Sequence, residues 1–90
     1  FCLVTALVVP HIPWTVGDPS HFNPQNIELP SYLADTPETR KEFVNYLAEI
    51  EVLDQQVGSI LKVLREENLA DDTIVIFTSE HGAQFPFTVR

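Results

Sequence analysis

Thr73-Ile-Val-Ile-Phe-Thr-Ser-Glu-His-Gly82 is the stretch that decides the fold. Residues 73–78 form a continuous run of β-branched and aromatic side chains, which is typical of a strand buried on both faces of a sheet. Glu80 and His81 follow the run directly, at the carboxyl end of the predicted strand. Open α/β sheets bind ligands at this edge. The stretch therefore predicts a strand followed by a metal or catalytic loop, residues 79–90.

A second apolar run occupies residues 1–9 and ends at Pro10. Both of its alternating faces are apolar except for one threonine, so it also predicts a strand buried on both faces. His11 follows directly and lies between Pro10 and Pro13. Because proline fixes φ, the two prolines limit the movement of the imidazole. We expect a rigid turn that presents His11.

Residues 10–35 carry several prolines and asparagines and show no period of two or 3.6 residues. A stretch of roughly twenty residues without regular structure is uncommon inside a compact domain and usually marks a functional loop or a surface wrap. We expect Leu29, Tyr32 and Leu33 to hold this proline-rich loop against the body of the protein.

An amphipathic helix is predicted over residues 36–67, with Asp35 or Thr36 as its N-cap and Pro37 in its first turn. Its apolar stripe consists of Phe43, Leu47, Ile50, Leu53, Val57, Ile60, Leu61 and Leu64. Its polar side consists of Lys41, Glu42, Asn45, Glu49, Glu51, Gln55, Lys62 and Glu66. The helix would be roughly 45 Å long, whereas a compact domain of this size is about 30 Å across. Either the helix breaks within residues 54–58 or it lies on a larger body.

Two residues in the middle of this helix predict packing. Asp54 lies at the edge of the apolar stripe, so we expect a half-buried carboxylate that bonds to a nearby backbone group or hydroxyl. Gly58 costs about 1 kcal/mol relative to alanine in a helix interior. We expect Gly58 to allow a close approach between helix and sheet.

Strand, helix and strand in this order predict a βαβ unit, which makes the chain α/β with two parallel strands. Parallel strands place their carboxyl ends at the same edge of the sheet. His11, Glu80 and His81 are therefore expected to project toward one crevice, although they lie about 70 residues apart in sequence. An antiparallel arrangement of the two strands would contradict this convergence.

The three converging side chains suit two kinds of chemistry. Glu80 offers oxygen ligands for Ca²⁺, Mg²⁺ or Mn²⁺, and His81 adds a nitrogen ligand. The alternative is an exposed Glu80 with His81 capping the strand end. His11 suits a general acid or base, because an imidazole titrates near neutral pH. The alternative is a turn histidine bonded to a backbone carbonyl, and the pattern alone leaves both alternatives open.

Ninety residues with 13 acidic and 5 basic side chains give a formal charge of −8. This balance argues against a nucleic-acid surface, because phosphate binding needs clustered lysine and arginine. The sequence predicts neither a signal peptide nor a membrane span, since no stretch approaches the roughly 18 apolar residues that a span needs. Cys2 has no partner for an internal disulfide.

The chain resembles the type I sulfatases of the alkaline-phosphatase-like superfamily. Residues 71–82 resemble the segment DNTIVIFTSDHG of that family, residues 53–64 are similar to its LD..VG..L..L helix, and residues 10–13 to its PHxP element. Residues 36–40 and 85–86 look most like the heparan N-sulfatase (sulfamidase) branch. The resemblance implies that the chain is a βαβ fragment of an alkaline-phosphatase-like parallel-sheet domain.

The resemblance also implies site roles. Glu80 and His81 stand where sulfatases place two ligands of a divalent cation, usually Ca²⁺, and His11 stands where they place a histidine that interacts with the sulfate ester and its leaving oxygen. Glu80 replaces the aspartate of the family. The formylglycine nucleophile of the family, made from Cys or Ser in a C/S-x-P-S-R motif, has no counterpart here, since Leu3 follows Cys2. We expect it in an upstream part of the parent protein.

We therefore expect residues 1–90 to be part of the catalytic domain of a sulfatase that hydrolyses sulfate esters or sulfamates of sulfated small molecules or glycans. Two alternatives are a phosphodiesterase or phosphonate hydrolase of the same superfamily, and a non-catalytic α/β module that docks on a partner. The resemblance suits an extracellular or periplasmic parent without fixing the compartment. We expect the 90-residue chain to be inactive alone and to self-associate through unpaired sheet edges.

Overall fold

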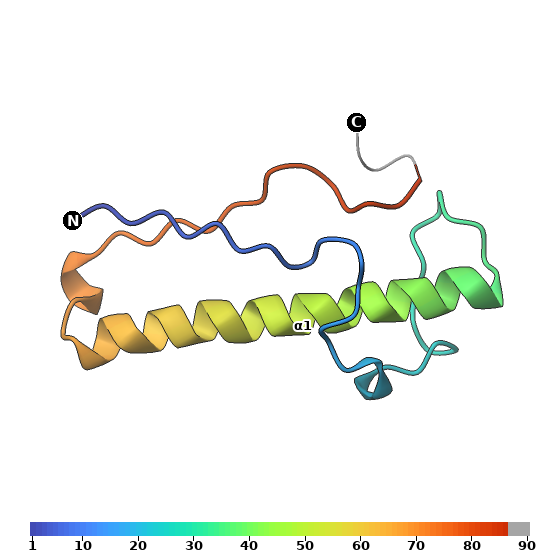
Figure 1. The fold of residues 1–90 in the computed structure, drawn as a ribbon, viewed down its shortest axis with the longest axis horizontal. Coiled ribbons are helices and arrows are strands. Elements are labelled where there is room, and N and C mark those ends of the chain that lie inside the picture. The colour runs from blue at the N-terminus through green and yellow to red at the C-terminus, as the bar shows by residue number, and fades with distance from the viewer. Residues whose placement is uncertain (87–90) are drawn as a thin grey trace.

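The structure is a computed structural model that describes residues 1–86. Its elements are the 3₁₀ turn η1 (Pro19–His21), the helix α1 (Pro37–Glu66) and the 3₁₀ turn η2 (Ala70–Asp72). Figure 1 shows α1 as one continuous rod along the long axis, and the chain measures 48 × 30 × 20 Å. The helix does not break at residues 54–58, which leaves the other expectation, a helix lying on a larger body.

Local signals explain where α1 begins and ends. Thr36 is the N-cap, because its Oγ1 accepts a 3.1 Å hydrogen bond from the backbone N–H of Thr39. Pro37 occupies the first turn, where its missing N–H costs nothing. At the other end Asn68 adopts φ 56°, a left-handed conformation that asparagine tolerates and that closes helices. The observed bounds of α1 thus agree closely with the helix predicted over residues 36–67.

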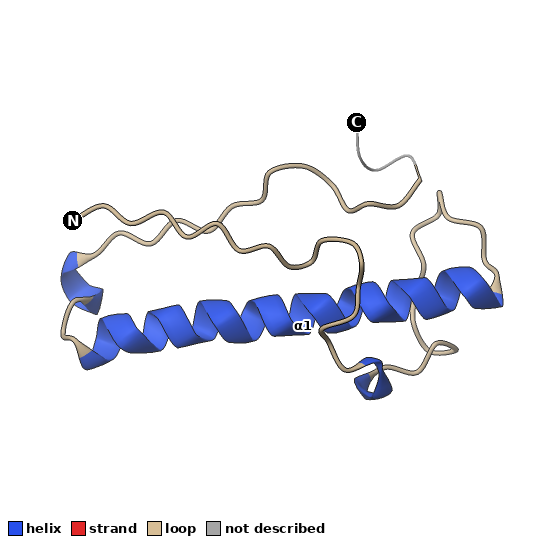
Figure 2. Cartoon of the chain, in the orientation of Figure 1, coloured by secondary structure: helices blue, strands red, loops and turns tan. Residues whose placement is uncertain are grey.

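The prediction of two strands is not confirmed by the structure. Residues 1–9 and 73–78 are loop within the described chain, as Figure 2 shows, and they run in the same direction, away from the η2 end of α1 (Figure 1). Val4 is 84% exposed and Ile74 is 90% exposed. A parallel strand is stable when other strands and covering helices bury it on both faces, and the described chain supplies neither cover. The two segments therefore run in the same direction, as parallel strands would, but neither of them forms a strand.

The small core lies where the proline-rich loop crosses α1. Its buried residues are Val44, Ala48 and Glu49. Glu49, which the sequence placed on the polar side, is 1% exposed, and its Oε1 accepts a 2.6 Å hydrogen bond from the N–H of Val16. Gly17 packs so closely that an added Cβ would collide with the backbone of Ala48. The loop is therefore held on α1 by the buried carboxylate of Glu49 and by the close approach that glycine allows at position 17, and not by an apolar stripe alone.

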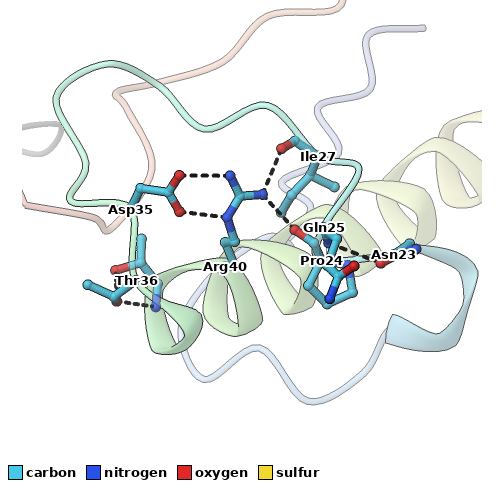
Figure 3. Close-up of polar contacts among 8 residues, drawn as sticks. Asn23, Pro24, Gln25, Ile27, Asp35, Thr36 and Arg40 are labelled. Atoms are coloured by element: carbon cyan, nitrogen blue, oxygen red, sulfur yellow. Dashed lines mark hydrogen bonds and ion pairs between the residues drawn. The ribbon is translucent and has the colours of Figure 1, made fainter.

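A second contact holds the loop to the first turns of α1 (Figure 3). The Nε and Nη2 atoms of Arg40 donate to both carboxylate oxygens of Asp35, at 2.6 and 2.9 Å. Its Nη1 donates to the carbonyls of Pro24 and Ile27, at 2.7 and 3.0 Å. The hydrogen bond from Arg40 holds the pKa of Asp35 below its ordinary value. One planar guanidinium thus joins three points of the loop to the helix.

The second half of α1 makes less contact than the sequence suggested. Asp54 is exposed, and a Cβ added to Gly58 would meet no atom within 4 Å. Both packing predictions are wrong for this structure, because residues 1–86 form no sheet that covers this part of the helix. The helices of residues 1–86 include none with the length and apolar character to cross a membrane.

Candidate functional site

His11 lies exposed in the turn after residues 1–9, and its imidazole makes two hydrogen bonds. Its Nδ1 lies 2.6 Å from the carbonyl oxygen of Ile12, and its Nε2 lies 3.1 Å from Nε2 of Gln84. The backbone N–H of Ile12 donates to Oε1 of the same Gln84 side chain, at 2.7 Å. The turn that carries His11 is therefore joined to the loop that begins at residue 79.

Glu80 and His81 lie next to each other at the start of that loop. The Oε2 of Glu80 is 3.7 Å from Nε2 of His81, and both side chains are exposed. His81 Nδ1 lies 3.3 Å from the carbonyl of Gly82. An oxygen and a nitrogen donor at this spacing suit a divalent cation. Within residues 1–86, however, no group of three or more His, Cys, Asp or Glu side chains is placed to hold a metal ion.

The structure thus brings together some of the predicted site residues and leaves others apart. Glu80 and His81 face each other, whereas the hydrogen bonds of His11 within the described chain go to Ile12 and Gln84. Residues 87–90, the last part of the predicted loop 79–90, lie outside the described residues. The two candidate ligands form at most part of a metal site, and its remaining donors would have to come from elsewhere in the protein.

An open groove of about 550 Å³ lies beside the His11 turn. Its walls include Ile12, Trp14, Tyr32, Gln84 and Phe85. The ring of Trp14 stacks on that of Phe85 with centroids 4.6 Å apart, and it meets Tyr46 edge-on at 5.5 Å. These aromatic rings fix the loop after Gly82 against α1. Glu38 and Glu42 make one side of the groove acidic.

A charged cluster that the sequence did not reveal joins η1 to α1. His21 Nδ1 lies 2.8 Å from a carboxylate oxygen of Glu51, and its Nε2 lies 3.3 Å from Asp18. The hydrogen bond that His21 donates to Glu51, with the negative charges of Glu51 and Asp18, raises the pKa of His21. Asp18 also caps η1, since it accepts a 3.0 Å hydrogen bond from the N–H of Ser20. The sequence shows no motif for this cluster, because its members come from separate segments.

The comparisons with known proteins agree on one family. The sequence model of the family described as Sulfatase matches residues 1–87. The human protein named N-sulphoglucosamine sulphohydrolase is 34% identical over 73 residues, which is 81% of this chain and 14% of the relative. Mouse iduronate 2-sulfatase is 33% identical over an alignment of 91 positions, gaps included, that covers 88% of this chain and 16% of the relative.

Bacterial relatives match as well. An ulvan-active sulfatase of Formosa agariphila is 31% identical over 58 residues, which is 64% of this chain and 10% of the relative. No solved structure matches the chain. The chain spans about a seventh of the length of the human relative, so it corresponds to one part of such a protein. On the family match over nearly all of its length, the chain belongs to the sulfatase family.

Proposed function

We propose that this chain is a part of a sulfatase catalytic domain that hydrolyses sulfate esters or sulfamates, and that it supplies three side chains to the active site. In this proposal Glu80 and His81 are ligands of a divalent cation, Ca²⁺ by family resemblance, and His11 exchanges a proton with the leaving group. The formylglycine nucleophile comes from a part of the protein outside these 90 residues.

The observation that carries the proposal is the hydrogen bonding between the His11 turn and Gln84. Gln84 lies three residues after His81, so its contacts with His11 and Ile12 support a common location for the turn and the candidate ligands. The contacts link segments that are 72 and 73 residues apart in sequence. The proposal extends this link from the His11 turn to the candidate ligands themselves.

Each proposed role follows from the chemistry of the side chain. A bound divalent cation supplies charge stabilisation at a transferring sulfuryl group. Glu80 and His81 would hold this ion, and their exposed, adjacent donor atoms fit such a role in part. His11 is exposed, and its neighbour Ile12 and its hydrogen-bond partner Gln84 line the groove. The imidazole is the side chain most often used as a general acid or base.

For the substrate class we propose a sulfated sugar. The matched relatives carry names that refer to N-sulphoglucosamine, iduronate and ulvan. The aromatic walls of the groove beside His11 suit a small molecule, whereas its acidic side, formed by Glu38 and Glu42, would repel a sulfate group. A comparison of sulfated glucosamine with choline sulfate as substrates separates a sugar substrate from a small sulfate ester without a sugar.

The test of the proposal uses a complete sulfatase that contains residues 1–90 and an aryl sulfate as substrate. His11→Ala should lower kcat by about 10² to 10⁴, the usual contribution of a general acid or base. His21→Ala is the matched control, because His21 is also exposed but pairs with Glu51 on α1. A His11→Ala enzyme with wild-type kcat would overturn the role of His11. Hydrolysis by the 90-residue chain alone would show that no outside nucleophile is needed.

We also propose that the 90-residue chain self-associates when it is isolated. Large apolar side chains of residues 1–9 and 73–78 are exposed, and Phe1, Val4, Ile74 and Ile76 are each more than 80% exposed. Exposed apolar segments with unpaired backbone groups favour pairing with another chain. Sedimentation should show a mass that rises with concentration, whereas a sharply monomeric species would contradict this proposal.

A further inference from the structure

Three hydrogen bonds form a closed ring between the His11 turn and Gln84. They join the Ile12 N–H to Gln84 Oε1 at 2.7 Å, Gln84 Nε2 to His11 Nε2 at 3.1 Å, and His11 Nδ1 to the Ile12 carbonyl at 2.6 Å. Gln84 is half-buried, and its neighbour Phe85 stacks on Trp14. The backbone at residue 85 is thereby fixed, which aims the amide of Gln84 at the turn.

The ring permits only one assignment of protons. A backbone N–H can only donate, so the Gln84 atom that faces Ile12 must be the carbonyl oxygen. The other end of the amide is then the NH₂ group, which can only donate. His11 Nε2 must therefore accept, and the proton of the neutral ring lies on Nδ1, where it is donated to the carbonyl of Ile12.

From this ring we infer that Gln84 is a positioning residue, which holds the His11 imidazole in the tautomer with a proton on Nδ1 and a lone pair on Nε2. The inference rests on the proposed function for the catalytic importance of His11, but the tautomer itself is a property of the ring of hydrogen bonds. In a histidine-dependent reaction a wrong tautomer can cost up to about 10⁴ in kcat. Gln84 would thus act on the reaction through His11 and not by contact with the reacting atoms.

The positioning has a chemical consequence for substrate binding. With Nε2 as an acceptor, a substrate hydroxyl or a water that replaces the Gln84 amide can donate to His11 without a change of tautomer. An imidazole protonated on both nitrogens would place an N–H of His11 against the NH₂ group of Gln84, and the bond between them would be lost. The contact with Gln84 therefore presents Nε2 as a hydrogen-bond acceptor before substrate binds.

Substitutions of Gln84 separate this role from simple loop packing. Gln84→Glu keeps an oxygen for the Ile12 N–H but places a second acceptor opposite His11 Nε2 while the Ile12 carbonyl still faces Nδ1, so both ring nitrogens should carry a proton. Gln84→Leu keeps roughly the size of the side chain and removes both of its hydrogen bonds, so the tautomer preference should weaken to that set by the Ile12 carbonyl alone. Gln56→Glu introduces the same charge at an exposed position of α1 and should leave His11 unchanged.

The experiment records two-bond ¹H–¹⁵N spectra of labelled histidines in a complete sulfatase that contains residues 1–90, with circular dichroism as a folding control for every variant. We expect the wild type and Gln56→Glu to show protonated Nδ1 and unprotonated Nε2 in His11, and Gln84→Glu to show both nitrogens protonated. The inference would be overturned if wild-type His11 carried its proton on Nε2. It would also be overturned if the protonation pattern of His11 were the same in the wild type and in both Gln84 variants.

Kinetics in the complete sulfatase then separate the inference from the proposed function. Gln84→Leu should lower kcat roughly tenfold or more with little change in KM, because it affects the orientation of His11 and not the binding of substrate. If His11→Ala leaves turnover intact while the tautomer follows Gln84, the proposed function fails and the positioning stands. If His11→Ala abolishes turnover while the tautomer ignores Gln84, the positioning fails alone.

Discussion

Glu49 lies fully buried in α1, and its Oε1 accepts a 2.6 Å hydrogen bond from the backbone N–H of Val16. The same oxygen lies 3.4 Å from the N–H of Gly17. This carboxylate fixes the proline-rich loop six residues after its start, on the segment between His11 and η1. The position of the His11 turn on the helix therefore depends on Glu49.

Glu49→Ala should destabilise the chain by about 1 to 3 kcal/mol, because it leaves the N–H groups of Val16 and Gly17 without their acceptor in a part-buried site. Urea unfolding followed by circular dichroism measures the effect. Asp54→Ala is the control, since Asp54 is an exposed carboxylate on the same helix. Equal unfolding midpoints for the two variants would show that the contact with Val16 contributes nothing.

Two glycine substitutions should have opposite effects. Gly17→Ala should destabilise, because the new Cβ would collide with the backbone carbon and carbonyl of Ala48. Gly58→Ala should stabilise by roughly 0.5 to 1 kcal/mol, because Gly58 lies inside α1 with open space around it and alanine loses less backbone entropy in a helix. Thermal unfolding of both variants tests the pair, and a shift of both in the same direction would contradict the described packing.

The ion pairs of His21 should make stability depend on pH. Glu51 raises the pKa of His21, so the folded chain binds a proton more tightly than the unfolded chain. The resulting stabilisation is fully present below the unfolded value of about 6.5 and is lost as the pH rises through the folded value. The difference in urea midpoint between wild type and His21→Gln should therefore shrink from pH 5.5 to pH 9. A constant difference would show that the cluster does not depend on the charge of His21.

The sequence predicted those parts of the fold that depend on neighbouring residues. The limits of α1 follow from Thr36, Pro37 and the turn at Asn68, all of which act within a few residues of the helix ends. The strands at residues 1–9 and 73–78 were not confirmed, because a parallel strand needs partners and covering layers that lie far away in sequence. Glu49 was missed for a related reason, since its hydrogen-bond donor lies 33 residues earlier.

The sequence likewise predicted only part of the candidate site. The approach of the His11 turn to the loop after residue 78 was expected from the βαβ order, and the hydrogen bonds of Gln84 agree with it. Gln84 itself was not expected, because an amide in a loop belongs to no motif and its role depends on what it faces. Glu80 and His81 were expected as ligands, and this role stays a prediction.

The most direct test of the account measures divalent-cation binding and aryl sulfate hydrolysis in a complete sulfatase that contains residues 1–90. The wild type is compared with Glu80→Ala and His81→Ala, with Glu67→Ala at the exposed end of α1 as a control. We predict that both site variants lose at least about tenfold in cation affinity, that their turnover falls in parallel and that the control is unchanged. Wild-type cation affinity and turnover in both site variants would contradict the account.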